Sequence, residues 1–304
     1  MSQTYLIEGI RGSGKTVLMT TIAKELQDEE DWIVVNLNAA MNLLDDLARA
    51  LTNTVKRLPN LLKQGVNVSA LGFGFGINGT EEKTDSITVI ENILRLLKKR
   101  NKKLLITIDE VLHDDNMRVF ASEFQIFLRE DYPVFLIMTG LYENLNSIQN
   151  DPQLTFLLRS PKLQIEPLSI PAIVREYEAV LDIDEDTAKA LAHATKGYAF
   201  AFQALGALYW ENRDALSLDR IIEKLDGLLD EYVYRKIWRG LSGLEKKFLL
   251  SMNDEESTTA AEICAKSGIK KSSVAKYRER LIKIGLLNVP EYGCKWYFNF
   301  GTAG

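Results

Sequence analysis

The segment Glu8-Gly9-Ile10-Arg11-Gly12-Ser13-Gly14-Lys15-Thr16 (EGIRGSGKT) decides how the rest of the sequence is interpreted. A short apolar stretch precedes it at residues 5–7, and residues 15–27 after it have the spacing of an amphipathic helix. Glycines between a strand and a helix let backbone N–H groups surround an anion, and the helix N-terminus adds partial positive charge. The pattern Gly-x-x-x-x-Gly-Lys-Thr in this context therefore predicts a phosphate-binding loop.

The residue types of this loop suggest a role for its positions. Lys15 has the position from which an ammonium group reaches the β- and γ-phosphates of a nucleotide, and the Thr16 hydroxyl that of a Mg²⁺ ligand. ATP and Mg²⁺ are therefore the expected cofactors. The residues expected to contact the nucleotide are Gly9, Ile10, Arg11, Gly12, Ser13, Gly14, Lys15, Thr16 and Val17.

A second, independent motif supports this interpretation. The largely apolar residues 104–108 are followed directly by Asp109 and Glu110. A carboxylate pair at the end of a buried strand is costly unless a cation or a water network uses it. Asp109 is expected to hold the Mg²⁺ shell and Glu110 to polarise the attacking water. With both motifs present, ATP hydrolysis is predicted; a chance glycine-rich turn and a purely structural carboxylate pair are the alternatives.

The order of the expected elements predicts the fold class and three domains. Strands are expected at residues 5–7, 32–37, 103–108, 134–138 and 163–168, and helices at 15–27, 41–63, 86–100 and 117–129. Apolar strands that alternate with helices indicate an α/β core with a parallel sheet covered on both faces. We place this core at residues 1–168, a helical lid at 169–238 and a winged-helix domain at 239–304. The lid helices are expected at 171–181, 187–194, 199–210 and 218–234.

A glycine-rich insertion interrupts the core at about residues 59–83. Residues 65–77 alternate with period two and predict a hairpin. It is interpreted as a surface hairpin or as a contact loop for nucleic acid or a neighbouring subunit.

Composition limits the class of protein further. The 304 residues carry a net charge of −5, which argues against a protein that coats nucleic acid along its whole surface. No run of 18 apolar residues exists, so no membrane partner is expected, and the N-terminus lacks the features of a secretory signal. Two cysteines and two histidines exclude a disulfide framework and a histidine-rich metal site and suit a cytoplasmic location.

Two further positions are candidates for the reaction. Thr139 follows the apolar stretch 134–138, where its hydroxyl is placed to contact the γ-phosphate or the attacking water; a cap of the next turn is the alternative. Arg159 lies just before the last expected strand, where it is placed to stabilise transition-state charge in a neighbour's site. An ordinary surface arginine is the alternative.

The C-terminal region has its own pattern. Thr259 and Glu262 form a capping box before one helix, a second helix is expected at 272–284, and short strands at 286–289 and 295–299. Helix, turn, helix and wing is a DNA-binding geometry whose second helix enters the major groove. Double-stranded DNA is therefore a candidate partner, and a packing or protein-docking module is the alternative. The candidate DNA residues are Lys270, Lys271, Lys276 and Arg280.

Together these residues resemble the AAA+ branch of P-loop ATPases, most closely the origin-recognition and Cdc6-like initiators and their bacterial and archaeal relatives. The resemblance covers nearly the whole chain and is specific at residues 9–16 and 104–110. It implies that Thr139 is the residue called sensor 1 and that Arg159 is an arginine finger acting in trans within a homo-oligomer. It also implies a nucleotide-controlled switch that acts on DNA or assembles with it, with slow hydrolysis by an isolated subunit.

The sequence departs from that family in two places. The stretch Gly197-Tyr198-Ala199-Phe200, where a lid helix opens, lacks the arginine of the family's sensor 2. It is equally similar to the Gly-x-Pro motif of STAND-type and archaeal ATPases, with Ala199 in place of the proline. A regulatory NTPase is therefore an alternative function. A nucleotide-binding scaffold that does not hydrolyse ATP is a further alternative. Family members also carry an adenine-contacting segment before the first strand, and this sequence starts at that strand. We therefore expect weaker base selectivity.

Overall fold

The computed structural model of the chain describes residues 2–57, 85–252, 258–284, 286–288 and 295–296. The described residues form two compact units. One unit holds residues up to Glu8 together with Lys15–Gln164, and the other holds Gly9–Gly14 together with the chain from Ile165 onward. The predicted glycine-rich hairpin lies outside the described residues.

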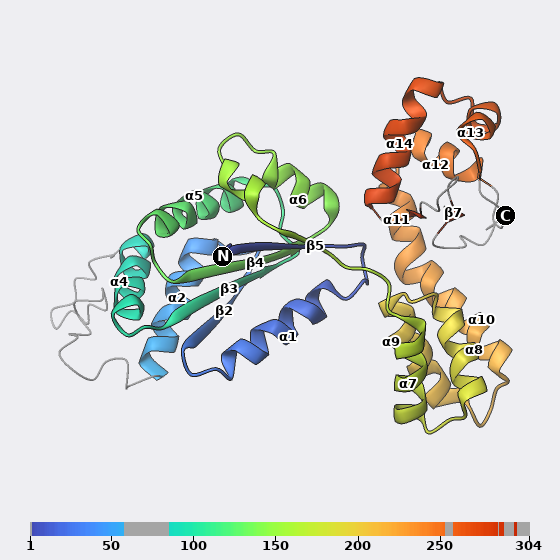
Figure 1. Ribbon diagram of the computed structural model, residues 1–304, viewed down its shortest axis with the longest axis horizontal. Coiled ribbons are helices and arrows are strands. Elements are labelled where there is room, and N and C mark those ends of the chain that lie inside the picture. Colours follow the sequence, from blue (N-terminus) through green and yellow to red (C-terminus); the bar gives the residue numbers. More distant parts are fainter. Residues whose placement is uncertain (1, 58–84, 253–257, 285, 289–294, 297–304) are drawn as a thin grey trace. The chain divides into compact units, whose positions relative to one another are not determined.

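The first unit is built on a parallel five-stranded sheet with the strand order β2-β3-β4-β1-β5 (Figure 1). The strands are β1 (Thr4–Glu8), β2 (Trp32–Asn38), β3 (Lys103–Asp109), β4 (Val134–Gly140) and β5 (Lys162–Gln164). The predicted α/β fold class with a parallel sheet is thus confirmed. Because β4 lies between β1 and β3, the end of β4 separates the strand that precedes the phosphate loop from the strand that ends at Asp109.

Helices cover both faces of this sheet, as the continuous apolar strands require. Alternate strand residues such as Leu6, Ile106 and Leu136 join one buried cluster with the apolar sides of α2 (Leu43–Arg57), α4 (Ser86–Lys99), α5 (Asp115–Arg129) and α6 (Tyr142–Gln149). In Figure 1, α5 and α6 lie above the sheet and α1 (Lys15–Gln27) lies below it. Helix α1 contacts β1 to β4, and its buried side chains include those of Met19 and Ala23.

Two parts of the first unit differ from the sequence-based expectation. The last strand was predicted at residues 163–168, but β5 ends at Gln164, and all its residues are exposed at the sheet edge. Helix α6 and a 3-10 helix at Thr155–Arg159 were not predicted. The first is only eight residues long and the second five, too short for a helical pattern to stand out.

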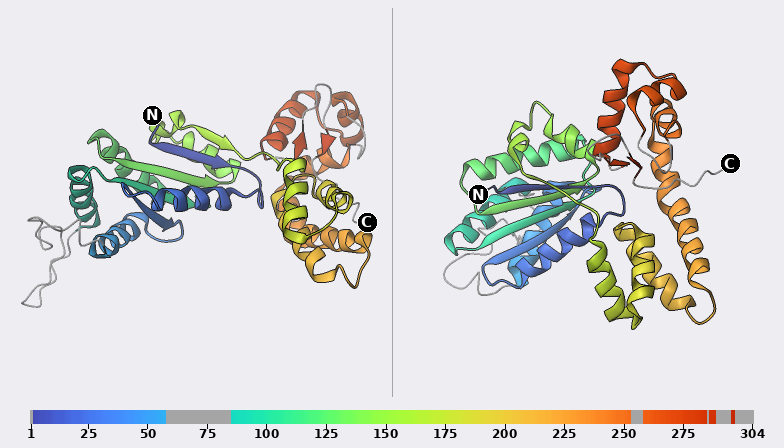
Figure 2. Two further views of the ribbon diagram at one scale, coloured as in Figure 1. Left: turned by 60° about the horizontal axis from the view of Figure 1, so that its bottom comes forward. Right: turned by 45° about the vertical axis from the view of Figure 1, so that its right-hand side comes forward.

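The second unit contains α7 (Ile170–Leu181), α8 (Glu185–Thr195), α9 (Ala199–Asn212) and α10 (Leu218–Leu229), which pack against one another (Figure 2). The helix expected at 218–234 differs in the structure, because α10 passes through a π-helical turn (Asp230–Tyr234) into α11 (Arg235–Gly240). Then follow α12 (Gly243–Leu250), α13 (Ala260–Ser267) and α14 (Lys271–Lys283).

A short antiparallel pair of strands, β6 (Leu287–Asn288) and β7 (Lys295–Trp296), follows α14. The rest of the predicted wing lies outside the described residues, and the division into lid and winged helix stays a prediction. In the described part of the chain, no helix combines the length and apolar character needed to cross a membrane.

Candidate functional site

The register of the sheet places the carboxyl ends of β1, β4 and β3 side by side. Ile7 in β1 pairs with Thr139 in β4, and Ile108 in β3 pairs with Met138 in β4. The residues that follow or end these strands therefore lie next to one another. Among them are Asp109 and Thr139, which the sequence places 30 residues apart.

Asp109 is held at this edge by two threonine hydroxyls. The Thr139 hydroxyl, which is fully buried, donates a hydrogen bond to Oδ1 of Asp109. The Thr16 hydroxyl, on α1, donates to Oδ2 of Asp109 at 2.7 Å. Both carboxylate oxygens are thus fixed by protein donors, which holds the side chain in one orientation.

Glu110 has an unusual backbone at the end of β3. Its φ is +51°, in the left-handed region that residues other than glycine seldom adopt. Its N–H donates to Oδ1 of Asp109 at 3.0 Å and to the Thr139 hydroxyl at 3.2 Å, which stabilises that conformation. The Glu110 side chain is exposed. Strained backbone of this kind is concentrated at functional sites, where the surrounding contacts hold it.

Helix α1 begins at Lys15, so the first turn carries Lys15, Thr16 and Val17. Lys15 is buried, whereas Thr16 and Val17 are exposed. The first turn contains no acidic residue, which leaves the positive end of the helix dipole available for an anion. The oxygens of Thr16 and Asp109 suit Mg²⁺, which binds one or two protein oxygens and completes its shell with phosphates and water.

Residues Gly9–Gly14 group with the second unit. The Tyr198 hydroxyl donates to the carbonyl of Arg11 at 2.6 Å, and the Phe200 N–H donates to the carbonyl of Gly12 at 3.1 Å. Gly12 has a φ of +75°, and a Cβ there would lie 2.3 Å from the Tyr198 hydroxyl. Tyr198 was not among the predicted site residues, although it lies in the stretch Gly197-Tyr198-Ala199-Phe200, which departs from the family pattern.

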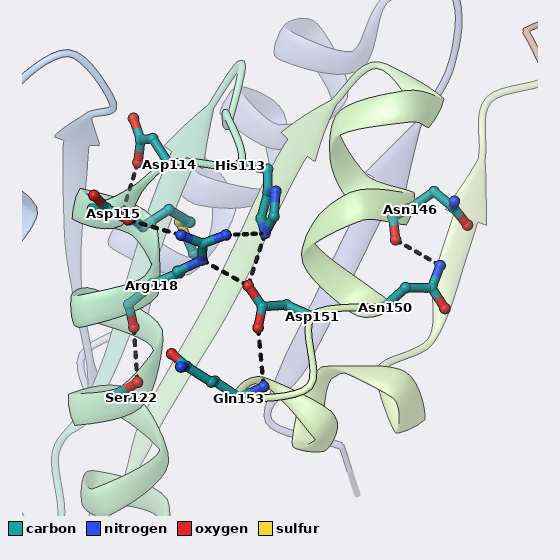
Figure 3. A network of polar contacts seen from close by, with 10 residues as sticks. His113, Asp114, Asp115, Arg118, Ser122, Asn146, Asn150, Asp151 and Gln153 are labelled. Atoms are coloured by element: carbon teal, nitrogen blue, oxygen red, sulfur yellow. Dashed lines mark hydrogen bonds and ion pairs between the residues drawn. The ribbon is translucent and has the colours of Figure 1, made fainter.

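A second polar cluster, also not predicted, lies just after Glu110 (Figure 3). His113 Nε2 and Arg118 Nε each lie 2.8 Å from Oδ2 of Asp151, and the Gln153 N–H donates to Oδ1 at 2.9 Å. The hydrogen bonds from His113, the Gln153 backbone and Arg118 hold the pKa of the buried Asp151 well below its usual range. This cluster fastens the segment after Glu110 to the residues before the 3-10 helix.

The candidate residues outside the phosphate loop have different surroundings. Arg159 is exposed at the last position of the 3-10 helix. Lys270, Lys271 and Lys276 are exposed at the start and on the surface of α14. The Arg280 guanidinium, however, forms an ion pair with Glu245 of α12, whose side chain is fully buried.

Glu245 has structural partners inside the second unit. Burial raises the pKa of Glu245, but hydrogen bonds from Ser242 and from the Arg280 guanidinium outweigh that effect and lower it. The Ser242 hydroxyl and the Glu245 carboxylate also form the capping box of α12. Arg280 thus fastens α14 to α12, and its predicted DNA contact stays a prediction.

Comparison with known proteins places the fold. The ORC2 protein of Aeropyrum pernix, in its ADPNP–ADP complexes, is similar with a TM-score of 0.60, 16% identity and coverage of 98% of this chain and 84% of that one. Its ADP form gives a TM-score of 0.50 at 15% identity with the same coverage. Cdc6p from Pyrobaculum aerophilum gives 0.47 at 15% identity over 96% of this chain and 82% of that one.

Comparison of the amino-acid sequence with family models and curated proteins gives fewer matches than comparison of the structure. A family model described as a domain of unknown function (DUF8462) matches residues 231–298, and no curated protein matches the chain. The likeness in fold to the Aeropyrum pernix ORC2 protein agrees with the expected resemblance to origin-recognition proteins, and it concerns the fold alone.

Proposed function

We propose that this chain binds ATP with Mg²⁺ at residues 9–17 and hydrolyses it slowly, as a nucleotide-controlled switch. The observation that carries the proposal is the hydrogen-bonded group of Thr16, Asp109 and Thr139 beside the exposed Glu110. Hard oxygen ligands next to a carboxylate that can orient water are the parts that in-line phosphoryl transfer needs. That the chain also has a glycine loop opening a helix supports the same reaction.

Each residue of the group has a separate task. Lys15 neutralises charge on the β- and γ-phosphates. Thr16 and Asp109 would hold Mg²⁺, which would supply further positive charge against the phosphates. Glu110 orients and polarises the attacking water. Thr139 fixes Asp109 and, through the Glu110 N–H, the backbone that displays this carboxylate.

The decisive variant is Glu110→Gln, which keeps the shape of the side chain and removes its negative charge. We expect ATP binding to persist and phosphate release to fall by about 100-fold or more, because general-base catalysis supplies roughly 10²–10⁴ in rate. Glu130→Gln, at an exposed carboxylate just after α5, is the matched control and should leave the rate unchanged. Equal release from wild type and Glu110→Gln would reject the catalytic role. ATP binding by a wild type that releases no phosphate would favour a non-hydrolysing scaffold.

Exposure of Arg159 favours a role in a second copy of the chain. We propose that it completes the neighbour's site, so that hydrolysis per subunit rises with protein concentration. Arg159→Ala retains its own Glu110 and Glu110→Gln retains Arg159, so mixing the two inactive variants should restore activity. Arg129→Ala, at an exposed arginine of α5, is the control. Failure of the mixture to gain activity, with both variants folded, would reject action in trans.

Exposure of Lys270, Lys271 and Lys276 favours a second candidate function, contact with double-stranded DNA. Lys271→Ala with Lys276→Ala should weaken binding to any duplex and reduce the slope of log K against log salt by about one for each lost phosphate contact. Lys247→Ala, exposed on α12, is the control. If the wild type binds no duplex in a salt-dependent manner, the alternative is a STAND-type regulatory NTPase whose C-terminal region docks protein.

A further inference from the structure

The phosphate loop and the first turn of α9 are joined inside the second unit by two hydrogen bonds. Tyr198 is the N-cap residue of α9, and its hydroxyl donates to the carbonyl of Arg11 at 2.6 Å. The Phe200 N–H, in the first turn, donates to the carbonyl of Gly12 at 3.1 Å. The first N–H groups of a helix have no acceptor within the helix, so the Gly12 carbonyl provides the acceptor that the Phe200 N–H lacks inside α9.

These bonds also orient the opposite side of the loop. A peptide unit is planar and trans, so its N–H points away from its carbonyl oxygen. With the Arg11 carbonyl directed at Tyr198, the N–H of Gly12 points away from α9. Backbone N–H groups in this part of a glycine loop are the ones that bind phosphate oxygens. The loop is thereby held in a conformation that presents a phosphate donor.

The surroundings of Tyr198 favour its hydrogen bond to the Arg11 carbonyl. Its side chain is 6% exposed and packs beside Phe200, with ring centroids 6.1 Å apart. Burial raises the pKa of the Tyr198 phenol well above its usual value, so the hydroxyl stays protonated and remains a donor. The space over Gly12 is filled by the same hydroxyl, so only glycine fits at that position of the loop.

We propose that Tyr198 is a positioning residue that pre-organises the phosphate loop and couples nucleotide binding to α9. The proposal rests on the proposed nucleotide binding at residues 9–17 and adds the residue through which the helical unit responds to it. Residues 197–200 contain no arginine, so the link runs through a tyrosine hydroxyl and a loop carbonyl and not through a phosphate contact.

The chain offers a matched control for the test. The Tyr177 hydroxyl, on α7, donates to the carbonyl of Phe202 in α9 at 2.6 Å, and that tyrosine is 3% exposed. Tyr177→Phe therefore removes the same kind of buried bond from the same unit without touching the loop. Dissociation constants of the full chain for a fluorescent ADP analogue and for ATP with Mg²⁺ would be measured for wild type and both variants, with the midpoint of thermal unfolding without nucleotide.

We expect Tyr198→Phe to raise the dissociation constant about five- to tenfold, the change that loss of one intramolecular hydrogen bond gives. Tyr177→Phe should leave it unchanged, although both variants should lose similar thermal stability. Unchanged affinity in Tyr198→Phe, a gain in affinity, or an equal loss in both variants would overturn the positioning role. A wild type that binds neither nucleotide would overturn the proposed function and this inference together.

Discussion

Replacement of Thr139 by valine tests whether the carboxyl edge of the sheet is organised for catalysis. Valine keeps the shape of threonine and removes only the hydroxyl. In the structure that hydroxyl donates to Asp109 and accepts the Glu110 N–H at 3.2 Å, and Thr139 itself is fully buried. Thr139→Val therefore removes the donor to one oxygen of Asp109 and one of the two acceptors of the Glu110 N–H.

The magnitude follows from the charge on Asp109. Hydrogen bonds to charged groups contribute about 1.5–3 kcal/mol, and each 1.4 kcal/mol in the barrier changes a rate about tenfold. If the bond serves to hold the two carboxylates in place for the reaction, kcat for ATP should fall about 10- to 100-fold. The KM should change little, because the loop residues that bind the phosphates are untouched.

The assay is steady-state phosphate release with two control variants. Thr139→Ser keeps the hydroxyl and should retain most of the rate. Thr107→Val removes another buried hydroxyl of the sheet, one that donates to Asn36 Oδ1 at 2.6 Å, and should cost stability without loss of kcat. A folded Thr139→Val protein with the kcat of wild type would refute the reasoning.

Three further variants test other parts of the structure. Glu245→Gln should lower the free energy of unfolding by about 2 kcal/mol. This is less than breaking a fully buried ion pair costs, because Arg280 is partly exposed. Urea unfolding identical to that of wild type would contradict this. The pKa of Asp151 is lowered by His113 and its other donors, so its stabilising effect is present above about pH 4 and is lost as the pH falls below that. The difference in unfolding temperature between wild type and Asp151→Asn should accordingly shrink on acidification, and a difference independent of pH from 7 to 3 would count against it. Gly12→Ala places a Cβ where the Tyr198 hydroxyl lies and adds about 1–2 kcal/mol of strain from the left-handed backbone. Both thermal stability and nucleotide affinity should therefore fall. A variant that binds ADP like wild type would show that the loop adopts another conformation.

The parts of the fold that were predicted correctly are those whose signal is local. Strands β1 to β4 each contain a largely apolar run, and the start of α1 at Lys15 follows from the glycine loop before it. The bounds of β5 were predicted incorrectly because it is an edge strand of three residues, all of them exposed. An exposed strand needs no apolar side chains, so its sequence carries little apolar pattern. Hydrophobic periodicity reports burial, and an exposed edge provides little of it.

The parts of the candidate site that were missed depend on distant pairs. Asp109 and Thr16 belong to recognisable motifs, so their proximity could be expected before the structure. Tyr198 lies 187 residues from its partner Arg11, and no sequence motif contains both residues, so their contact could not be predicted. The ion pair of Arg280 with Glu245, 35 residues earlier, was likewise not predicted, because no local pattern links the two residues.

The division of the chain between Gly14 and Lys15 has a consequence for how its modules can be separated. A fragment that ends at Gln164 would contain the whole EGIRGSGKT segment yet lack Tyr198 and Phe200, which donate hydrogen bonds to the carbonyls of Arg11 and Gly12. Conversely, a fragment that begins after Gln164 would lack Gly9–Gly14, whose Arg11 and Gly12 carbonyls accept hydrogen bonds from Tyr198 and Phe200.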